Sequence, residues 1–475
     1  MTTPPPSTPI SPTPTSTPRA AGRRLRRATD GRPVAPVRIV HLGLGNFFRA
    51  HQSYYTEHAP DAGDWGIAAF TGMGVWPADV LAEQDNLYVL MVNEPEQPRP
   101  EVISSLSAVH PSDDHDSWLR YLASPEVVIV TSTVTEAGYR RNASGGLDLN
   151  DAEVAADIAA LQSDPLVSVS TAPGRFVAGL LARRAAGAGP LTFLPCDNVP
   201  DNGEMAHRVI TDFARAVDPT LAEWMAEHTT FVTTMVDRIT PRATDADRAD
   251  LVARTGIDDP SLVVTEPYLE WVLAGRFIAG RPAWEQAGAT FVDDTTPFET
   301  RKLWLLNGSH SLMAYAASIR GHETVAEAIA DPVVRDWVLQ WWDDAQSQLS
   351  LPEEHITAYR AALLDRYANP RIRHLLAQIA ADGSQKVPIR IVPALRAEVA
   401  AGRTPTGALR AVAAWVLHLR GEGAPVTDGA VADLQQQVAD DLPSAVAAVL
   451  AWLGLTDLHL DEPVLALAHE LSATP

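Results

Sequence analysis

Cysteine, lysine and long apolar runs are all scarce in this 475-residue chain. The single cysteine, Cys196, excludes an intramolecular disulfide and any metal site built from several cysteines. No run of about 18 apolar residues occurs, so we expect no membrane-spanning helix. The arginine-rich N-terminal segment is not followed by an apolar stretch, so we do not interpret it as a secretory signal. We therefore expect a cytoplasmic protein that does not associate with a membrane.

The composition is typical of a globular protein with a strong negative charge. Hydrophobic residues make up 46% and charged residues 20% of the chain, and the formal net charge is −22. This charge argues against nucleic acid as a partner, because the phosphate backbone would be repelled. The length is sufficient for two domains with well-buried cores.

Lysine is almost absent from the cationic residues. Of the 37 lysines and arginines, only Lys302 and Lys386 are lysine. A guanidinium stays protonated, whereas a desolvated ammonium can release its proton. A lysine retained in such a chain is therefore a candidate for proton chemistry. Lys302 is followed by the apolar run 303–306, which would lower the pKa of its amine.

Two further polar residues follow Lys302 at helical spacing. With about 100° per residue, Lys302, Asn307 and His310 project at roughly 0°, 140° and 80° on a helix. They share slightly less than half of the helix circumference and could face one pocket. On spacing alone, a helix start with a chance lysine and two satisfied polar groups is an equally good interpretation.

The first 33 residues differ in composition from the rest. They are rich in Pro, Thr and Ser and then in arginine, so we expect residues 1–33 to form a disordered tail. A basic tail could bind an acidic surface, but an extension without a selected role is the favoured interpretation.

A possible dinucleotide-binding loop follows the first expected strand. Residues 37–42 form a short apolar run, and Gly43, Leu44, Gly45, Asn46 and Phe47 come next, before an expected helix. Glycines at such a turn let the backbone approach a pyrophosphate, which then lies at a helix N-terminus. The third glycine of the usual motif is missing, so an ordinary strand-to-helix turn is an open alternative.

The second expected strand ends without the acidic residue that usually binds a ribose 2′-hydroxyl. Residues 65–70 are followed by Thr71, Gly72 and Met73. The expected cofactor is NAD, and NADP is not excluded.

The order of elements predicts an α/β fold with two parts. Expected strands alternate with helices such as 152–161 and 174–186; the strands are 65–70, 87–92, 127–134, 191–194 and 231–236. This alternation predicts a Rossmann-type, doubly wound sheet domain over 34–294. Extended runs nearly vanish after about residue 295, so we expect an all-helical C-terminal domain over 295–475.

Other polar residues follow expected strands, where ligands bind in open sheets. Asn198, Asp237 and Glu136 are of this kind, although turns or a surface ion pair explain them as well. Lys386 and the arginines 366, 371 and 373 form a cationic group suited to a carboxylate or phosphate. A solvated helix face is the alternative there. Zinc-dependent dehydrogenases are excluded because Cys196 is the only cysteine, and neither lysine has the tyrosine four residues earlier that short-chain dehydrogenases need.

Together these motifs resemble the polyol-specific long-chain dehydrogenase/reductase family, whose members include mannitol 2-dehydrogenases and fructuronate reductases. The matching segments occur in family order between about residues 37 and 420: 39–52, 133–139, 196–198, 235–239, 302–310 and 382–386. The Lys-x4-Asn-x2-His element at 302–310 is the most specific of them. The missing third glycine is also a feature of this family's loop.

The resemblance implies a role for each candidate. Lys302 would be the general base, and Asn198 and Asn307 would bind the developing oxyanion. His310 would orient the substrate hydroxyl, and Glu136 would relay a proton. The family also implies that no metal is needed. Asp237, Arg366, Arg373 and Lys386 would bind substrate, the three cations being candidates for a hexuronate carboxylate.

Two features of the sequence bear on the expected substrate. Gln378 and the segment 143–150 resemble the fructuronate reductase branch more than the mannitol dehydrogenases, which tend to have arginine at the position of Gln378. We therefore expect conversion between D-mannonate and D-fructuronate, with mannitol and fructose as the alternative. A catalytically silent nucleotide-binding protein on the same fold is a further alternative. The family includes monomers, so we expect a monomer or a weak homo-oligomer.

Overall fold

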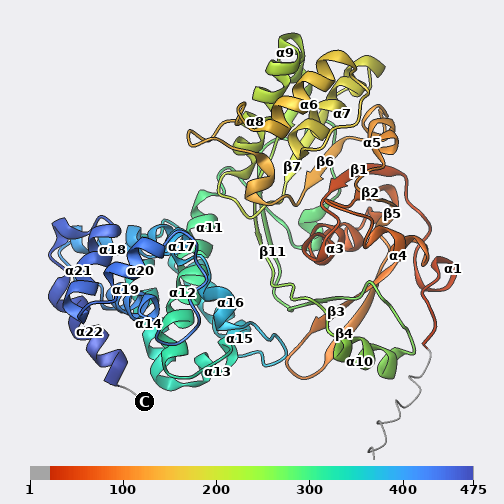
Figure 1. Cartoon of the computed structure of the whole chain (residues 1–475). Helices are drawn as coiled ribbons and strands as arrows, with labels where there is room; N and C mark the ends of the chain where they lie inside the picture. Colours follow the sequence, from red (N-terminus) through yellow and green to blue (C-terminus); the bar gives the residue numbers. More distant parts are fainter. Residues whose placement is uncertain (1–21, 474–475) are drawn as a thin grey trace, which may run out of the picture.

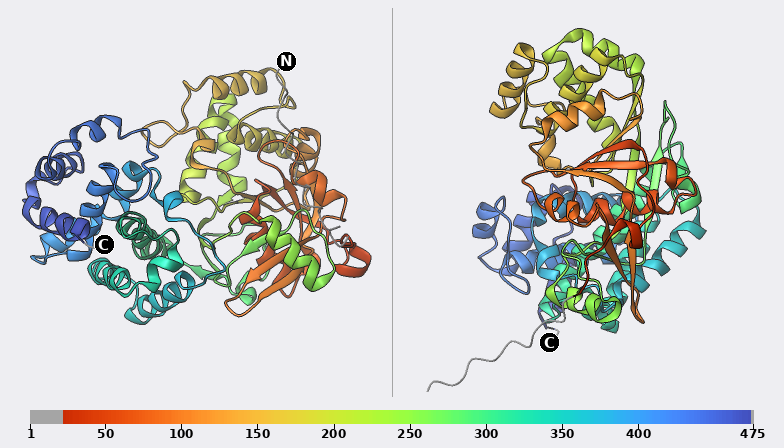
Figure 2. Two further views of the ribbon diagram at one scale, coloured as in Figure 1. Left: turned by 60° about the horizontal axis from the view of Figure 1, so that its bottom comes forward. Right: turned by 90° about the vertical axis from the view of Figure 1, so that its right-hand side faces the viewer.

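The protein consists of a mixed α/β part followed by a helical part. The structure is a computed structural model that describes residues 22–473. Figure 1 shows the two parts side by side, and the left view of Figure 2 shows the same arrangement after a turn. The last strand is β12 (Thr290–Val292), and helix α11 (Thr296–Arg301) begins the helical part. Within residues 22–473 no helix combines the length and apolarity that crossing a bilayer requires.

The end of the expected disordered tail is ordered, which corrects that expectation for residues 22–33. Helix α1 (Arg27–Asp30) lies here, and Leu25 is fully buried beside Leu87 and Leu251. Arg27 donates hydrogen bonds to the backbone carbonyls of Ser104 and Leu106. The composition of this segment did not reveal that Leu25 is buried or that Arg27 binds backbone carbonyl oxygens. Residues 1–21 lie outside the described part of the chain.

The main sheet has the strand order of a doubly wound nucleotide-binding fold, which confirms the predicted class. Its six strands are all parallel and lie in the order β5-β2-β1-β6-β7-β8. Their bounds are β1 Val37–Leu42, β2 Gly66–Phe70, β5 Leu106–His110, β6 Ile129–Ser132, β7 Leu191–Pro195 and β8 Thr229–Phe231. The carboxyl ends of these strands face the helical part.

Both faces of the sheet are covered, because successive strand residues point to opposite sides. In β1, Val40 and Leu42 belong to one apolar core and Ile39 to another. The first core lies under α5–α9 and the second under α2 and α3. The helices of this part are α2 Asn46–Ala50, α3 Gln52–His58, α4 Ala78–Ala82, α5 His115–Leu122, α6 Ala152–Ser163, α7 Ala172–Ala186, α8 Asn202–Val217, α9 Pro219–His228 and α10 Asp245–Thr255.

One expected strand lies outside the main sheet, and another is divided between two sheets. The run at 87–92 is β3 (Tyr88–Asn93), which pairs with β4 (Pro98–Ile103) and β10 (Val263–Thr265) in a separate sheet. The run at 231–236 divides at Val232 into β8 and β9 (Thr233–Asp237), and β9 pairs with β11 (Glu270–Ala274). An apolar run indicates a strand but carries no information on which strand will pair with it.

The helical part is built around a large apolar core rich in tryptophan. Trp341, Trp342 and Trp415 are among its most deeply buried side chains. Its longer helices are α14 Pro332–Gln346, α15 Glu353–Tyr367, α18 Val392–Ala400, α19 Thr406–Leu419, α21 Leu442–Trp452 and α22 Asp461–Ala473, and its shorter ones are α12 Ser309–Leu312, α13 Val325–Ala330, α16 Leu376–Ala380, α17 Gly383–Arg390 and α20 Ala432–Gln437.

The segment that carries Lys302 is a π-helix, from Lys302 to Gly308. Its wider turn leaves carbonyl groups without the usual helical partners. Indole N–H groups of α14 supply partners, since Trp341 donates to the Trp304 oxygen and Trp342 to the Leu305 oxygen, each at 2.9 Å. A π-helix with i to i+5 bonding brings the fifth residue back almost above the first. Lys302 and Asn307 therefore lie closer to one face than the α-helical spacing predicted.

We expect Gly308→Ala to destabilise the protein, because a Cβ at Gly308 would lie 2.6 Å from the nearest ring atom of Trp341. Relieving the overlap must displace a fully buried indole and its bond to Trp304, at a cost of about 1–3 kcal/mol. Urea unfolding followed by tryptophan fluorescence would measure the loss. Gly63→Ala is the control, since no atom lies within 4 Å of its added Cβ. Equal unfolding midpoints for the two variants would contradict this account of the π-turn.

Candidate functional site

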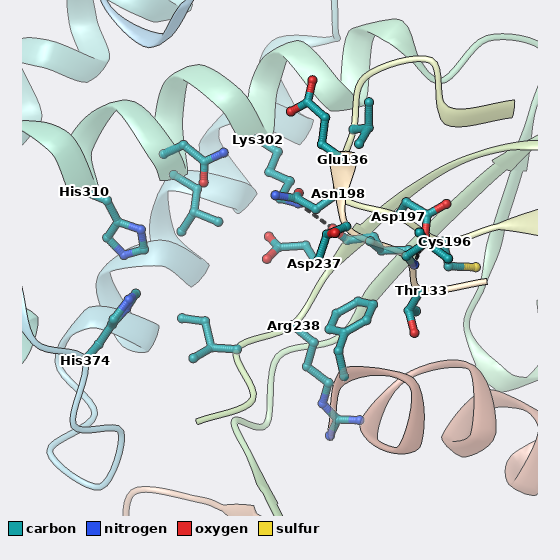
Figure 3. Close-up of a pocket in the computed structure, with 18 residues that line it drawn as sticks. Thr133, Glu136, Cys196, Asp197, Asn198, Asp237, Arg238, Lys302, His310 and His374 are labelled. Atoms are coloured by element: carbon teal, nitrogen blue, oxygen red, sulfur yellow. Dashed lines mark hydrogen bonds between the residues drawn. The ribbon is translucent and has the colours of Figure 1, made fainter. Parts of the chain in front are cut away.

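A cavity of about 440 Å³ lies where the carboxyl ends of the strands meet the π-helix. We call it the junction pocket (Figure 3). The mixed α/β part contributes residues that follow β6, β7 and β9, and the helical part contributes residues from the π-helix and α12. Among the predicted site residues, it brings together Phe47, Glu136, Asn198, Asp237, Lys302, Asn307 and His310.

The Lys302 amine links the two parts of the molecule. Its Nζ donates to Asn198 Oδ1 at 2.8 Å and to the Val236 carbonyl oxygen at 2.6 Å. Asn198 follows β7, and Val236 lies in β9. A neutral amine that donates two N–H bonds keeps a lone pair, and a protonated amine keeps a third proton. The two fixed acceptors therefore leave one position of the nitrogen available for exchange with a substrate.

The surroundings lower the pKa of Lys302 below the ordinary lysine value. Burial is the main cause, and the charge of Arg366 acts in the same direction. The carboxylates of Asp237, Glu270 and Glu299 oppose the shift. An amine tuned in this way can gain and lose a proton nearer neutral pH than a solvated lysine.

Asn307 and His310 complete the polar wall of the junction pocket. No described residue forms a hydrogen bond with the Asn307 side-chain amide, which leaves it free to bind a ligand. His310 is almost fully buried, and its Nε2 has no partner among residues 22–473. Burial lowers the pKa of His310 well below its ordinary value, and the nearby His374, Arg366 and Arg390 contribute. The imidazole is therefore neutral at physiological pH.

Arg366 has a structural role, which corrects the expectation that its guanidinium is free for a substrate carboxylate. Arg366 binds Asp237 through two N–H groups at 2.8 and 2.9 Å, and Glu266 through two bonds at 2.9 and 2.8 Å. All three side chains are buried. Burial would raise the pKa of Asp237, but the charge and hydrogen bonds of Arg366 bring it below the ordinary value.

Asp237 lines the junction pocket but its oxygens are already engaged. Besides Arg366, it accepts a 2.9 Å hydrogen bond from the Tyr359 hydroxyl. Asp237 acts on the site through its charge, which favours the protonated form of Lys302.

Two other expected substrate cations, Arg373 and Lys386, do not line the junction pocket. The Arg373 side chain is 73% exposed and pairs with Glu323 at 3.8 Å. The Lys386 amine donates to the carbonyl oxygens of Ile379, at 3.2 Å, and Ala381, at 2.5 Å. These contacts correct the expectation of a cationic cluster around the substrate, because each cation meets a different partner within the protein.

Glu136 lies at the rim of the junction pocket. Its side chain is 69% exposed and pairs with Arg141. This position fits an exchange of protons with solvent, and the relay role stays a prediction.

The residues from Gly43 to Phe47 form the glycine loop. A second cavity, of about 260 Å³, adjoins this loop, and we call it the loop pocket. Gly43 lines it, together with Gly72 and Met73 after β2 and Thr133 after β6. Gly43 has φ +112°, and a Cβ there would lie 2.5 Å from the Thr133 carbonyl oxygen, so only glycine fits this turn. The amides of Gly43 and Leu44 donate to the Phe70 oxygen, at 2.9 Å each, and the Leu44 side chain is buried.

Of the other loop residues, Gly45 and Asn46 make hydrogen bonds within the fold, and Phe47 lines a cavity. Asn46 Oδ1 accepts a 2.7 Å bond from Arg49, and Gly45 donates to the Gly43 oxygen at 2.6 Å. Phe47 lies in the wall of the junction pocket. The glycine loop thus connects the two cavities at the carboxyl ends of β1, β2 and β6. This is where open parallel sheets bind dinucleotides.

The sequence reasoning missed His374 and the Val236 carbonyl. His374 lines the junction pocket and lies in a turn before α16, within the domain that we expected to be all-helical. Pro370 gave no warning, because proline is favoured at the first position of a helix. Backbone carbonyls such as that of Val236 leave no signal in side-chain patterns.

Two family models match the chain over most of its length. Residues 37–286 match the mannitol dehydrogenase Rossmann domain, and residues 294–468 match the mannitol dehydrogenase C-terminal domain. The chain belongs to the mannitol dehydrogenase family. It is therefore an oxidoreductase whose relatives act on sugar alcohols and sugar acids.

Relatives in this family carry different substrate names. The D-mannonate oxidoreductase of Escherichia coli (strain K12) is 37% identical over 441 residues, which cover 90% of this chain and 89% of the relative. The mannitol 2-dehydrogenase of Cereibacter sphaeroides is 33% identical over 452 residues, covering 92% and 93%.

Two solved structures resemble this chain, and one of them contains a cofactor. The structure of Pseudomonas fluorescens mannitol 2-dehydrogenase with NAD and D-mannitol aligns with a TM-score of 0.76 and 33% identity, over 93% of this chain and 92% of that one. A substrate-free D-sorbitol dehydrogenase aligns with a TM-score of 0.87 and 29% identity, over 95% and 100%. The family and the fold therefore support a nicotinamide cofactor.

We expect Arg366→Met to destabilise the enzyme strongly, because it leaves the Asp237 and Glu266 carboxylates buried without their counter-ion. Removing one partner of a buried ion pair costs about 3–5 kcal/mol. The urea midpoint of unfolding should fall accordingly. Arg373→Met is the matched control, since within residues 22–473 that arginine pairs only with the exposed Glu323, and its midpoint should barely change. Similar losses in the two variants would show that burial does not set the strength of the Arg366 cluster.

Proposed function

We propose that this enzyme interconverts a secondary alcohol and a ketone on a linear sugar derivative, with D-mannonate and D-fructuronate as its substrates. The observation that carries the reaction type is the Lys302 amine, fixed by two acceptors in a desolvated pocket beside two side-chain amides. The D-mannonate oxidoreductase relative and the branch-specific residues around Gln378 support the choice of substrate.

D-mannitol and D-fructose are the second candidate pair, and one observation favours them. Arg366 is paired, and Arg373 and Lys386 lie outside the junction pocket, so the cations expected to meet a carboxylate do not face it. A neutral polyol needs no such cation.

The residues around the loop pocket fit a nicotinamide dinucleotide. Gly43 closes the turn against β6, and the first amides of α2, from Asn46 onward, have no intrahelical acceptor and suit a phosphate. We propose NAD as the cofactor, and it would supply the hydride acceptor when bound. Arg140 and Arg175 line the loop pocket without any carboxylate among its described lining residues. NADP is therefore the second candidate.

In this proposal Lys302 takes the hydroxyl proton during alcohol oxidation and returns it during ketone reduction. Asn198 accepts from Lys302 through Oδ1, so its Nδ2 can donate to the substrate oxygen. Asn307 has an unengaged amide that can donate to the same oxygen. Donors fixed before the reaction stabilise the developing negative charge without reorganising. His310 would orient the hydroxyl, and Glu136 at the rim would pass the proton to solvent.

The proposed chemistry assigns no role to a metal, since Lys302 supplies the base. Within the described part of the chain, no three His, Cys, Asp or Glu side chains are grouped so as to hold a metal ion. We also propose that the enzyme acts in the cytoplasm as a monomer or weak homo-oligomer. Light scattering during size-exclusion chromatography would measure the assembly.

We expect Lys302→Met to lower kcat by about 10²–10⁴-fold, the usual contribution of a general base, while cofactor binding persists. In the unaltered enzyme, the oxidation rate should rise with pH and level off below the ordinary lysine pKa, because only the neutral amine accepts a proton. Lys386→Met is the control, since the other lysine lies outside the junction pocket. It should keep this pH profile, and a profile that survives in Lys302→Met instead would overturn the assignment.

We expect the purified enzyme to reduce D-fructuronate with a higher kcat/KM than D-fructose, with NADH as the reductant. The assay follows NADH absorbance with each ketone, and then repeats the better pair with NADPH. Faster turnover of fructose would decide for the mannitol alternative. Absence of NADH oxidation with both ketones would favour the catalytically silent alternative.

A further inference from the structure

The end of the junction pocket formed by the helical part holds two histidines without hydrogen-bond partners. His310 and His374 have ring centroids 4.9 Å apart in an edge-to-face arrangement. His310 Nε2 and His374 Nδ1 are buried, and neither has a hydrogen-bond partner among residues 22–473. Figure 3 shows both rings on the side of the pocket away from Asp197 and Thr133. Buried polar atoms without partners are uncommon and call for a ligand or a function.

Two other cations near this end, Arg366 and Arg390, do not line the junction pocket. Arg366 is held by Asp237 and Glu266. Arg390 donates to the Asn307 carbonyl oxygen and to Ser311 Oγ, at 3.3 and 3.2 Å. Lys302 is fixed beside the proposed reacting oxygen. The two imidazoles are therefore the groups that could still offer a proton to an anion here.

A hexuronate has its ketone and its carboxylate toward opposite ends of the carbon chain. If the ketone oxygen lies between Lys302, Asn198 and Asn307, the remaining chain can extend along the pocket toward His310 and His374. Resting on the proposed function, we propose that His374 is the residue that binds the substrate carboxylate, and that it takes up a proton when it does so. A neutral polyol would not need this proton.

Burial and a nearby guanidinium keep His374 neutral in the free enzyme. Burial lowers the pKa of His374 to about 4, and the charge of Arg366 adds to the shift. His310 contacts its ring, the charge of Arg366 acts on it, and Lys302 and Asp237 line the same pocket. Tyr367 and Arg390 are neighbours of His310, and Glu323 and Arg373 flank the turn of His374.

An arriving carboxylate reverses this balance. Its negative charge favours imidazolium, so the pKa of His374 is higher in the complex than in the free enzyme. The added affinity for a uronate is then complete below the pKa of His374 in the free enzyme, and it is lost as the pH rises to the pKa of the complex. The affinity for a neutral ketose has no such dependence on His374.

The test is His374→Asn, assayed with D-fructuronate and with D-fructose. A hydrogen bond to a charged group is worth about tenfold or more in affinity. The KM for fructuronate should rise by at least that factor, with kcat nearly unchanged, while the KM for fructose stays the same. The increase of the fructuronate KM with pH should also disappear. His355→Asn, at an exposed histidine of α15, controls for the effect of replacing a histidine by asparagine.

A measurement on the unaltered protein does not depend on how the variant folds. Calorimetric titration with D-mannonate in two buffers of different ionisation enthalpy should reveal uptake of a proton, and titration with D-mannitol should not. Equal KM changes for both ketones in His374→Asn, or mannonate binding without proton uptake, would overturn the role of His374 and leave the proposed function standing. If the unaltered enzyme turns over fructose but not fructuronate, the proposed function itself fails.

Discussion

The site depends on the π-helical turn that begins at Lys302. Its carbonyl groups cannot all be satisfied within the helix, and the indole N–H groups of Trp341 and Trp342 take two of them. The two tryptophans lie in the core of the helical part, so buried side chains of that core hold the π-helical turn. The consequence is geometric, because residues five apart come onto one face. Lys302 and Asn307 can then line the same pocket.

The second constraint is electrostatic and acts across the junction of the two parts. Asp237 and Glu266 come from the mixed α/β part, and Arg366 comes from α15 of the helical part. Their buried pairing fixes the position of a negative charge close to Lys302. Asp237 favours the protonated amine, whereas burial and Arg366 favour the neutral one. The proton affinity of the amine therefore depends on how the two parts pack against each other.

Sequence patterns predicted the fold class well, because the strand-and-helix alternation and the loss of extended runs after residue 295 are local signals. Strand pairing was harder, as β3 shows, since the partner of a strand is decided by distant residues. The site divides in the same way. The Lys302, Asn307 and His310 group could be predicted from spacing, although the spacing assumed an α-helix. Arg366, Arg373 and Lys386 could not be placed, because an arginine in a sequence does not reveal whether a carboxylate already binds it. His374 was hidden in a turn that looked like a helix.

The unequal use of arginine and lysine now has a physical explanation for one of the two lysines. Buried arginines here bind carboxylates and carbonyl oxygens, as Arg366 and Arg183 do. That role needs a charge that does not titrate and a planar set of donors. The position of Lys302 needs the opposite, a compact cation that can lose its proton between two fixed acceptors. Lys386 limits the argument. Its amine also meets only carbonyl oxygens and its pKa is also lowered by burial, yet it lies outside the junction pocket. In this chain both lysines occupy positions where an ammonium group binds oxygen acceptors. Only Lys302 also lines the junction pocket, and that position is what makes it the candidate for proton transfer.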